Sequence, residues 1–129
     1  MSKPISILGI FVADLTFRTD RMPRQGETVI GNSFKLGPGG KGSNQAVAAR
    51  RAGAEIMFIT KIGKDTFGDI AMKLYADEGI NSDFIWEIPN IATGAAGIMV
   101  NEKSGDNSII VVPGVADALV PDDLDEAES

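Results

Sequence analysis

The chain is organised around one glycine-rich stretch, Leu36-Gly37-Pro38-Gly39-Gly40-Lys41-Gly42-Ser43-Asn44-Gln45, which runs directly into the small residues 46–49. Glycines allow a backbone to approach a neighbouring group closely, and a helix that follows at once directs its unpaired N–H groups to the same place. Lys41 adds a cation on a long stem, and Asn44 adds both a donor and an acceptor. The stretch therefore predicts a binding site for a polar ligand at the start of a helix.

The composition is that of one globular domain. The chain has 129 residues, of which 43% are hydrophobic, and it contains neither cysteine nor histidine. A chain of this length can bury a core of its own. The missing residue types exclude disulfides, Cys/His zinc sites and any nucleophile that depends on histidine within these residues. Catalysis here would need carboxylates, lysine or a metal ion.

The net charge of −6 comes from one end of the chain. No Lys or Arg follows Pro113, whereas acids and bases balance before it. The acids after Pro113 are Asp117, Asp122, Asp123, Asp125, Glu126 and Glu128. A balanced body with an acidic tail gives no reason to expect nucleic-acid binding, which needs a basic face. The apolar residues 5–13 are too short to span a membrane, so we expect a cytoplasmic protein without a membrane partner.

Three apolar runs predict buried strands. Ile5–Val12 and Phe84–Pro89 are rich in β-branched and aromatic residues, and Glu55–Thr60 lies between them. Lys61–Lys64 is expected to be the short turn that leaves the second strand. Near-continuous apolar runs are typical of strands covered on both faces, and helical segments separate these three. The order predicts a parallel, right-handed α/β layer structure.

Two helices are expected between these strands. Ser43–Ala52 has Ser43 as its expected N-cap, and Gly53 stands where a helix-ending glycine belongs. The second helix is capped by Asp65 or Thr66 and presents one apolar face until Gly79 ends it. Asp65 is interpreted as a cap without chemistry.

Two half-exposed excursions interrupt the α/β order. Residues 15–36 alternate charged and apolar side chains and predict two antiparallel strands. Residues 95–100 and 108–112 predict a hairpin, because turn-forming residues join them. Together the excursions suggest one small accessory sheet. Residues 119–127, with Pro121 at a first-turn position, carry the signals of a starting helix and then stop, which suggests a fragment.

Asp14 directly follows the first expected strand. Ligands bind at this edge of an open α/β sheet, so a carboxylate there is a candidate binding group. An Asx-type turn that ends the strand would place an aspartate there equally well. Position alone leaves both interpretations open.

The glycine stretch fails two familiar phosphate-binding patterns. Walker A requires a glycine where Lys35 stands and Ser or Thr where Gly42 stands. The dinucleotide pattern G-x-G-x-x-G matches residues 37–42, but it must occupy the first strand-to-helix turn, with an acid about 20 residues further on. Here it follows an excursion, and residues 58–62 contain no carboxylate. We interpret that match as coincidental.

A longer spaced pattern resembles the first signature of the ribokinase-like (phosphofructokinase B-type) carbohydrate kinases, and within them most closely the ribokinase branch. The resemblance covers nearly the whole chain. Its residues are Gly39-Gly40-Lys41-Gly42-Ser43-Asn44-Gln45-Ala46, Gly53 and Gly63, with Gly9, Ala13-Asp14, Pro23, Gly26-Glu27-Thr28, Gly63-Lys64-Asp65-Thr66-Phe67-Gly68 and Thr93-Gly94 around them.

The resemblance implies the N-terminal part of a three-layer α/β/α fold with a mainly parallel sheet and a small β lid. The core would comprise residues 1–14, 37–92 and 113–129, and the lid strands would be 15–36 and 93–112. The C-terminal nucleotide-binding half would be absent from residues 1–129.

The resemblance also implies a sugar site. Asp14 would accept hydrogen bonds from two sugar hydroxyls, and Lys41 and Asn44 would hold others. Gly40 would let the sugar approach where a side chain would block it. Read in isolation, Lys41 could instead be a solvated loop lysine. Ribokinases usually have Asn two residues before the aspartate, whereas this chain has Val12.

The family's catalytic base lies in a C-terminal segment, so the resemblance implies no catalytic residue in this chain. ATP and Mg²⁺ would serve the intact kinase, and a dependence on a monovalent cation stays open. We expect residues 1–129 alone to have no kinase activity. The alternatives are a non-enzymatic sugar-binding or dimerising module that pairs through lid strands, a kinase for fructose or a nucleoside, and, as the weakest option, a dinucleotide-binding domain.

Overall fold

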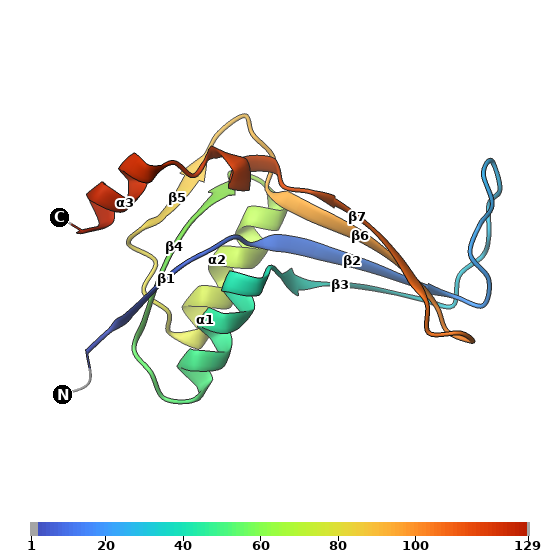
Figure 1. Cartoon of the computed structure of the whole chain (residues 1–129), viewed down its shortest axis with the longest axis horizontal. Coiled ribbons are helices and arrows are strands. Elements are labelled where there is room, and N and C mark those ends of the chain that lie inside the picture. Colours follow the sequence, from blue (N-terminus) through green and yellow to red (C-terminus); the bar gives the residue numbers. More distant parts are fainter. Residues whose placement is uncertain (1–2, 129) are drawn as a thin grey trace.

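The computed structural model describes residues 3–128 (Figure 1). The described elements follow one another as β1 (Ile5–Leu8), β2 (Val12–Thr19), β3 (Ser33–Gly39), α1 (Lys41–Arg51), β4 (Ile56–Gly63), α2 (Thr66–Glu78), β5 (Ile85–Ile88), β6 (Gly94–Asn101), β7 (Asn107–Val112), the 3-10 helix η1 (Gly114–Ala118) and α3 (Pro121–Glu128). The strands form two sheets, a core sheet of order β1-β4-β5 and a lid sheet of order β3-β2-β6-β7. The lid sheet extends away from the helices as an arm.

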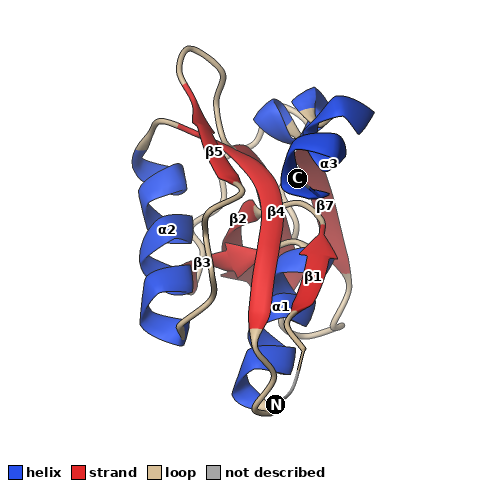
Figure 2. Ribbon diagram, turned by 90° about the vertical axis from the view of Figure 1, so that its left-hand side faces the viewer, coloured by secondary structure: helices blue, strands red, loops and turns tan. Residues whose placement is uncertain are grey.

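The core sheet is parallel throughout, with β4 in the centre (Figure 2). Ile7 of β1 stands opposite Phe58, and Ile85 of β5 stands opposite Thr60. Parallel strands need a crossover between them, and α1 and α2 supply the covering layer in those crossovers. The expected parallel α/β arrangement is confirmed.

Helical segments cover both faces of β4. Successive side chains of a strand point to opposite faces. Phe58 and Ile62 are fully buried in the hydrophobic cluster with residues of α1 and α2. Lys61 points the other way, where its Nζ lies 2.9 Å from the Ala118 carbonyl oxygen and 3.0 Å from Asp123 Oδ2. The two faces give the sheet its helical layers, which is the expected three-layer order.

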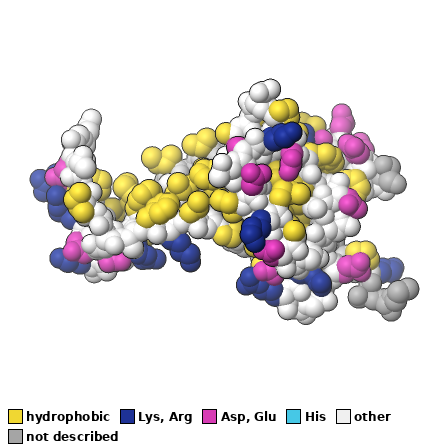
Figure 3. Space-filling model, turned by 180° about the vertical axis from the view of Figure 1, so that it is seen from behind, with side chains coloured by type: hydrophobic (Ala, Val, Ile, Leu, Met, Phe, Trp, Pro, Cys, Tyr) yellow, Lys and Arg dark blue, Asp and Glu magenta, His cyan; other side chains and the backbone are white. Residues whose placement is uncertain are grey.

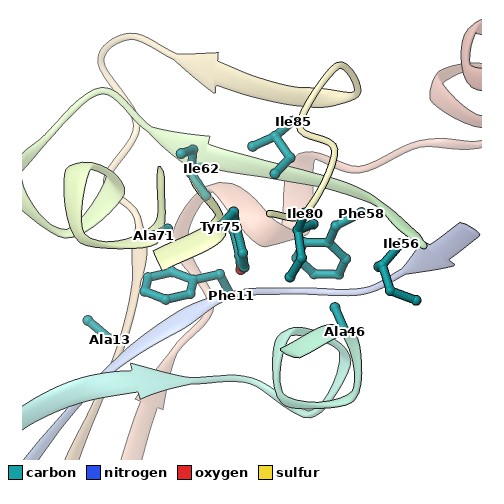
Figure 4. Packing of buried hydrophobic residues seen from close by; sticks show 10 residues of the cluster. All are labelled: Phe11, Ala13, Ala46, Ile56, Phe58, Ile62, Ala71, Tyr75, Ile80 and Ile85. Carbon is teal, nitrogen blue, oxygen red and sulfur yellow. The ribbon is translucent and has the colours of Figure 1, made fainter. Parts of the chain in front are cut away.

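The core is built around the ring of Tyr75 (Figure 4). Phe11 and Phe58 contact this ring edge-on, with centroids 6.4 and 5.2 Å from it. The cluster comprises Phe11, Ala13, Ala46, Ile56, Phe58, Ile62, Ala71, Tyr75, Ile80 and Ile85. The alanines let the helices approach the strands closely, so α1 stands directly against β1 and β4.

The lid sheet contains both sequence excursions. β2 pairs antiparallel with β3 and parallel with β6, and β6 and β7 form an antiparallel hairpin. Its strands extend past the expected bounds, because β2 begins at Val12 and β3 continues to Gly39. Residues 20–32 form a loop rather than strand, with Ile30 89% exposed. The predicted accessory sheet exists, but the two strands of its first hairpin lie further apart in the sequence than expected, and a longer loop joins them.

The apolar run Ile5–Val12 is not one strand, which corrects the prediction. β1 ends at Leu8, and the chain enters the lid sheet at Val12. A Cβ added to Gly9 would lie 2.8 Å from Gly42 Cα, so the backbone of α1 passes very close to this crossing. Asp14 therefore lies inside a lid strand and does not follow a core strand. Periodicity cannot show this break, because both strands are apolar here.

The glycine stretch also differs from the prediction. Gly37–Gly39 belong to β3, and α1 begins at Lys41 with Gly40 as its N-cap, without a side-chain cap. Ser43 is not the N-cap, because its hydroxyl is buried and lies 2.7 Å from the Tyr75 hydroxyl. Lys61–Gly63, expected as a turn, are the last residues of β4.

The other helix ends match expectation. Asp65 caps α2 by accepting a hydrogen bond of 2.8 Å from the Gly68 N–H, and Gly79 ends α2 in the left-handed conformation. Gly53 also has a positive φ, after α1. Pro121 is the first residue of α3. Among residues 3–128, every helix is too short or too polar to cross a membrane.

Candidate functional site

Asp14 lies near the middle of the lid sheet, on the same face as Val12 and Thr16. Gly37 of β3 and Ala96 of β6 stand directly opposite it on either side. Its carboxylate lies over the backbone of Gly39, so that a Cβ at position 39 would collide with both carboxylate oxygens. The small neighbours at positions 37, 39 and 96 leave the carboxylate open to a ligand.

The Asp14 carboxylate is half-buried and has no hydrogen-bond donor among the described residues. Burial raises the pKa of this carboxyl above its ordinary value. A carboxylate that has lost part of its water and gained no donor is costly to the fold. The arrangement is suited to a ligand that brings its own donors, such as a polyhydroxylated molecule.

Gly40, Lys41 and Asn44 line one open cleft of about 620 Å³ where the lid sheet meets α1. The side chains of Lys41 and Asn44 are exposed and make no hydrogen bond or ion pair within residues 3–128. Val12 of β2 and Val111 of β7 also line this cleft. Free polar groups from α1 therefore face hydrocarbon from two lid strands.

Asp14 lines the neighbouring cleft, of about 280 Å³, together with Thr16, Arg18 and Lys35. The structure thus brings Gly40, Lys41 and Asn44 into one cleft and leaves Asp14 in the next. Val12 connects the two, since it lines the first cleft and precedes Asp14 by two residues on the same strand face.

Gly40 is required by the backbone as well as by any ligand. Its φ of 96° belongs to the left-handed region, which favours glycine. A Cβ at this position would collide with the carbonyl oxygen of Ile10. The turn from β3 into α1 is therefore pressed against the β1–β2 connection, and this contact sets where α1 begins.

Two residues that line the first cleft were not predicted as members of a site. The family pattern marks Val12 only as a departure, and the predicted hairpin contains Val111. Ala96 stands between Asp14 and Val111 across the sheet. The alternation of side chains along a strand would have placed Val12 on the same face as Asp14. The pairing of β2 with β6 joins residues more than 80 positions apart, and no local sequence signal predicts that pairing.

Asp65 does more than cap α2. Its Oδ2 accepts from the Thr93 N–H at 2.8 Å and its Oδ1 from the Thr93 hydroxyl at 2.7 Å, while the Gly63 N–H donates to that hydroxyl at 2.8 Å. Burial opposes ionisation of Asp65, but the hydrogen bonds from Thr93 and Gly68 outweigh it and hold the pKa below its ordinary value. These contacts hold the start of lid strand β6 against the last residue of β4 and the N-terminus of α2.

Comparison with known proteins identifies the family of this chain. Residues 2–129 match the family described as "pfkB family carbohydrate kinase". The deoxyribokinase of Salmonella typhi is 39% identical over 123 residues, covering 95% of this chain and 40% of that protein. The ribokinase of Dictyostelium discoideum is 40% identical over 129 residues, covering the whole chain and 40% of that protein.

The structure of Arabidopsis thaliana ribokinase complexed with ribose and ATP superposes with a TM-score of 0.83 at 30% identity, covering 97% of this chain and 42% of that one. The chain therefore spans about 40% of the length of the curated relatives it matches. The family match extends over nearly all 129 residues, and the fold agrees with it. The chain belongs to the pfkB family of carbohydrate kinases.

Proposed function

We propose that residues 1–129 form the sugar-binding and lid part of an ATP-dependent kinase that phosphorylates a primary hydroxyl of a pentose or a related sugar. The observation that carries the proposal is the half-buried Asp14 carboxylate, which has no donor within residues 3–128 and lies beside a cleft with the free side chains of Lys41 and Asn44. Family membership supplies the reaction class.

In this proposal each polar group has one task. Asp14 accepts hydrogen bonds from two sugar hydroxyls, because an ionised carboxylate has several lone-pair positions. Lys41 donates to hydroxyl oxygens, and Asn44 both donates and accepts. Gly40 offers a backbone without a side chain at the edge of the cleft. Together they hold the sugar in one orientation, which phosphoryl transfer requires.

The phosphoryl donor in this proposal is ATP with Mg²⁺. The described residues contain no group of three or more Asp, Glu, His or Cys side chains that could hold a metal ion, so they do not fit a metal site. The nucleotide site and the catalytic base are proposed to lie on residues outside 1–129, in a protein that works in the cytoplasm.

The test compares residues 1–129 with the complete protein that contains them. Purified residues 1–129 should show no ATP-dependent phosphorylation of ribose or deoxyribose in a coupled ADP-release assay, whereas the complete protein should phosphorylate at least one pentose. Turnover by residues 1–129 would contradict the proposal that the nucleotide site and the catalytic base lie outside these residues. Failure of the complete protein on pentoses, hexoses and nucleosides would contradict the proposed function.

A second candidate function, pairing of two copies through the lid, is favoured by the lid face opposite Asp14. Hydrophobic side chains run along the arm, and charged ones gather at its far end (Figure 3). Phe17 and Phe34, opposite each other in register, are 47% and 55% exposed, with ring centroids 5.0 Å apart. Ile110 is 71% exposed, and β3 and β7 leave free strand edges.

Light scattering on the complete protein tests this pairing. We expect a dimer that Phe17→Glu disrupts, because a charge buried against a second copy has no partner. The matched control, Ile30→Glu, changes an exposed loop residue and should leave the dimer intact. A monomeric wild type would contradict the pairing. The proposed sugar site, on the other face of the lid sheet, does not depend on this result.

A further inference from the structure

The candidate sugar site is divided between two parts of the structure. Asp14 belongs to lid strand β2, whereas Lys41 and Asn44 belong to α1, which packs on the core sheet. The distance between the carboxylate and the two α1 side chains therefore depends on how the lid sheet is joined to the core. Strand β6 is important for this joint, because it pairs with β2 along its whole length and Ala96 stands opposite Asp14.

Thr93 is the residue from which β6 leaves the core, and Asp65 holds it there. The Thr93 N–H donates to Asp65 Oδ2 at 2.8 Å, and the Thr93 hydroxyl donates to Asp65 Oδ1 at 2.7 Å. The Gly63 N–H, at the end of β4, donates to the hydroxyl oxygen of Thr93 at 2.8 Å. Thr93 is only 4% exposed, so water competes little for these bonds. The bonds therefore fix the start of β6 in position and direction.

Glycines bring the backbone very close to this contact. A Cβ at Gly63 would lie 2.5 Å from the Thr93 nitrogen, and a Cβ at Gly68 would collide with the Gly63 carbonyl oxygen. On the other side, a Cβ at Gly94 would lie 2.6 Å from the carbonyl oxygen of Pro113, the residue that follows β7. The two ends of the β6–β7 hairpin are thus packed against each other, and a shift at Thr93 displaces both.

The Asp65 carboxylate is occupied by the protein itself. Its two oxygens accept three hydrogen bonds, one from the Gly68 N–H that it caps and two from Thr93. Asp65 lines a cleft with Phe67 and Thr93 that is separate from the two clefts of the candidate site. The cap of α2 uses one of the three bonds, and the other two join the core to the lid.

We propose, resting on the proposed kinase function, that Asp65 is a positioning residue for sugar binding. Through Thr93 it fixes the direction of β6, and through the pairing of β6 with β2 it sets where the Asp14 carboxylate stands relative to α1. A sugar bound from both sides tolerates little displacement between them, because a remote mutation that misplaces a group by about 1 Å can cost about 100-fold. Asp65 itself contacts no substrate.

The experiment measures kcat and KM of the complete protein for ATP and for whichever of D-ribose and 2-deoxy-D-ribose it phosphorylates faster. Thr93→Val keeps the shape of the side chain but removes its hydroxyl. Asp65→Ser keeps a cap for α2 but has one side-chain oxygen in place of two. Both variants should raise KM for the pentose roughly 10- to 100-fold and leave KM for ATP unchanged. A residue that serves only the fold would not separate the two KM values.

Thr66→Val is the matched control, because Thr66 follows Asp65 directly and is exposed. It should leave both KM values unchanged. Thr93→Ser retains a hydroxyl and should keep KM for the pentose close to the wild-type value. Circular dichroism of each variant checks that it is folded.

A wild-type KM for the pentose in folded Thr93→Val and Asp65→Ser would overturn the inference while the kinase function stands. An equal rise in both KM values would also overturn it. Failure of both variants to fold would do the same, since the contact would then serve the fold alone. A wild-type protein that phosphorylates neither pentose would overturn the inference together with the pentose kinase function on which it rests.

Discussion

The hydroxyls of Ser43 and Tyr75 lie 2.7 Å apart inside the hydrophobic core, and both residues are fully buried. This hydrogen bond joins α1 to α2. Because Lys41 and Asn44 belong to the same first turns of α1, the bond also holds the helix end that carries the candidate binding groups. Ser43 therefore supports the candidate site by fixing α1 in the core, and it does not cap the helix.

Tyr75→Phe should destabilise the protein by about 1–3 kcal/mol, since it leaves the buried Ser43 hydroxyl without a partner. Urea unfolding of wild type and variant checks this. Ser43→Ala combined with Tyr75→Phe removes both polar groups, and the double variant should lose less than the sum of the two single losses. Strictly additive losses would show that the hydroxyls do not interact.

Asp65→Asn should lower stability at neutral pH by about 1–3 kcal/mol, because a charged acceptor of three hydrogen bonds becomes neutral. The folded-state pKa of Asp65 lies below its ordinary value, so the carboxylate stabilises the fold above that ordinary value and this stabilisation is lost as pH falls through the lowered pKa.

The pH dependence makes the Asp65 prediction specific. Denaturant midpoints of wild type and Asp65→Asn should differ at pH 7 and converge in strong acid. Asp69→Asn is the control, because Asp69 lies in the first turn of the same helix and is exposed. A difference that persists unchanged in acid would indicate a packing effect instead of lost charge.

Gly40→Ala should destabilise the fold more than Gly26→Ala does. Both glycines have positive φ, 96° and 78°, so both substitutions carry the conformational strain of about 1 kcal/mol or more. Only the Cβ at position 40 meets backbone, at the Ile10 carbonyl, whereas nothing lies near the Cβ position of Gly26. Thermal unfolding of the two variants measures the extra cost of placing a Cβ against the Ile10 carbonyl. Equal shifts in Tm for Gly40→Ala and Gly26→Ala would contradict the prediction.

Sugar binding by the complete protein should weaken as pH falls through the raised pKa of Asp14, because hydroxyl donors need the ionised carboxylate. Calorimetric titration of sugar across the acidic range measures this. Asp14→Asn should bind weakly at every pH. Asp83→Asn, an exposed aspartate outside both clefts, should bind like wild type.

Asp14→Asn should not destabilise the sugar-free protein. A folded-state pKa above the ordinary value means that ionisation of Asp14 opposes folding, so the free energy of unfolding falls as pH rises through the window between the two values. Removing the charge should leave Tm unchanged or higher at neutral pH. A large loss of Tm would mean that Asp14 has a structural partner and that weak binding reflects misfolding.

Local sequence signals predicted the elements of the core well. Gly79 and Asp65 mark the ends of α2, and β-branched runs mark β4 and β5, because capping and burial depend on residues near in the chain. They failed where the decisive contact is distant. Ser43 was predicted to cap the helix, but its hydroxyl pairs with the Tyr75 hydroxyl in the core. The run from Ile5 to Val12 was predicted to be one strand, but it breaks where Gly9 lies against Gly42.

The layer order, the helix that follows the glycine stretch and the family pattern can be predicted without the structure, since each depends on residue type and spacing along the chain. Three features depend on packing between distant segments: Asp14 lies on a lid strand, Gly40 is held against Ile10, and Val12 and Val111 line one cleft. The pairing of β2 with β6 brings together residues more than 80 positions apart, and long-range packing, not local propensity, selects it.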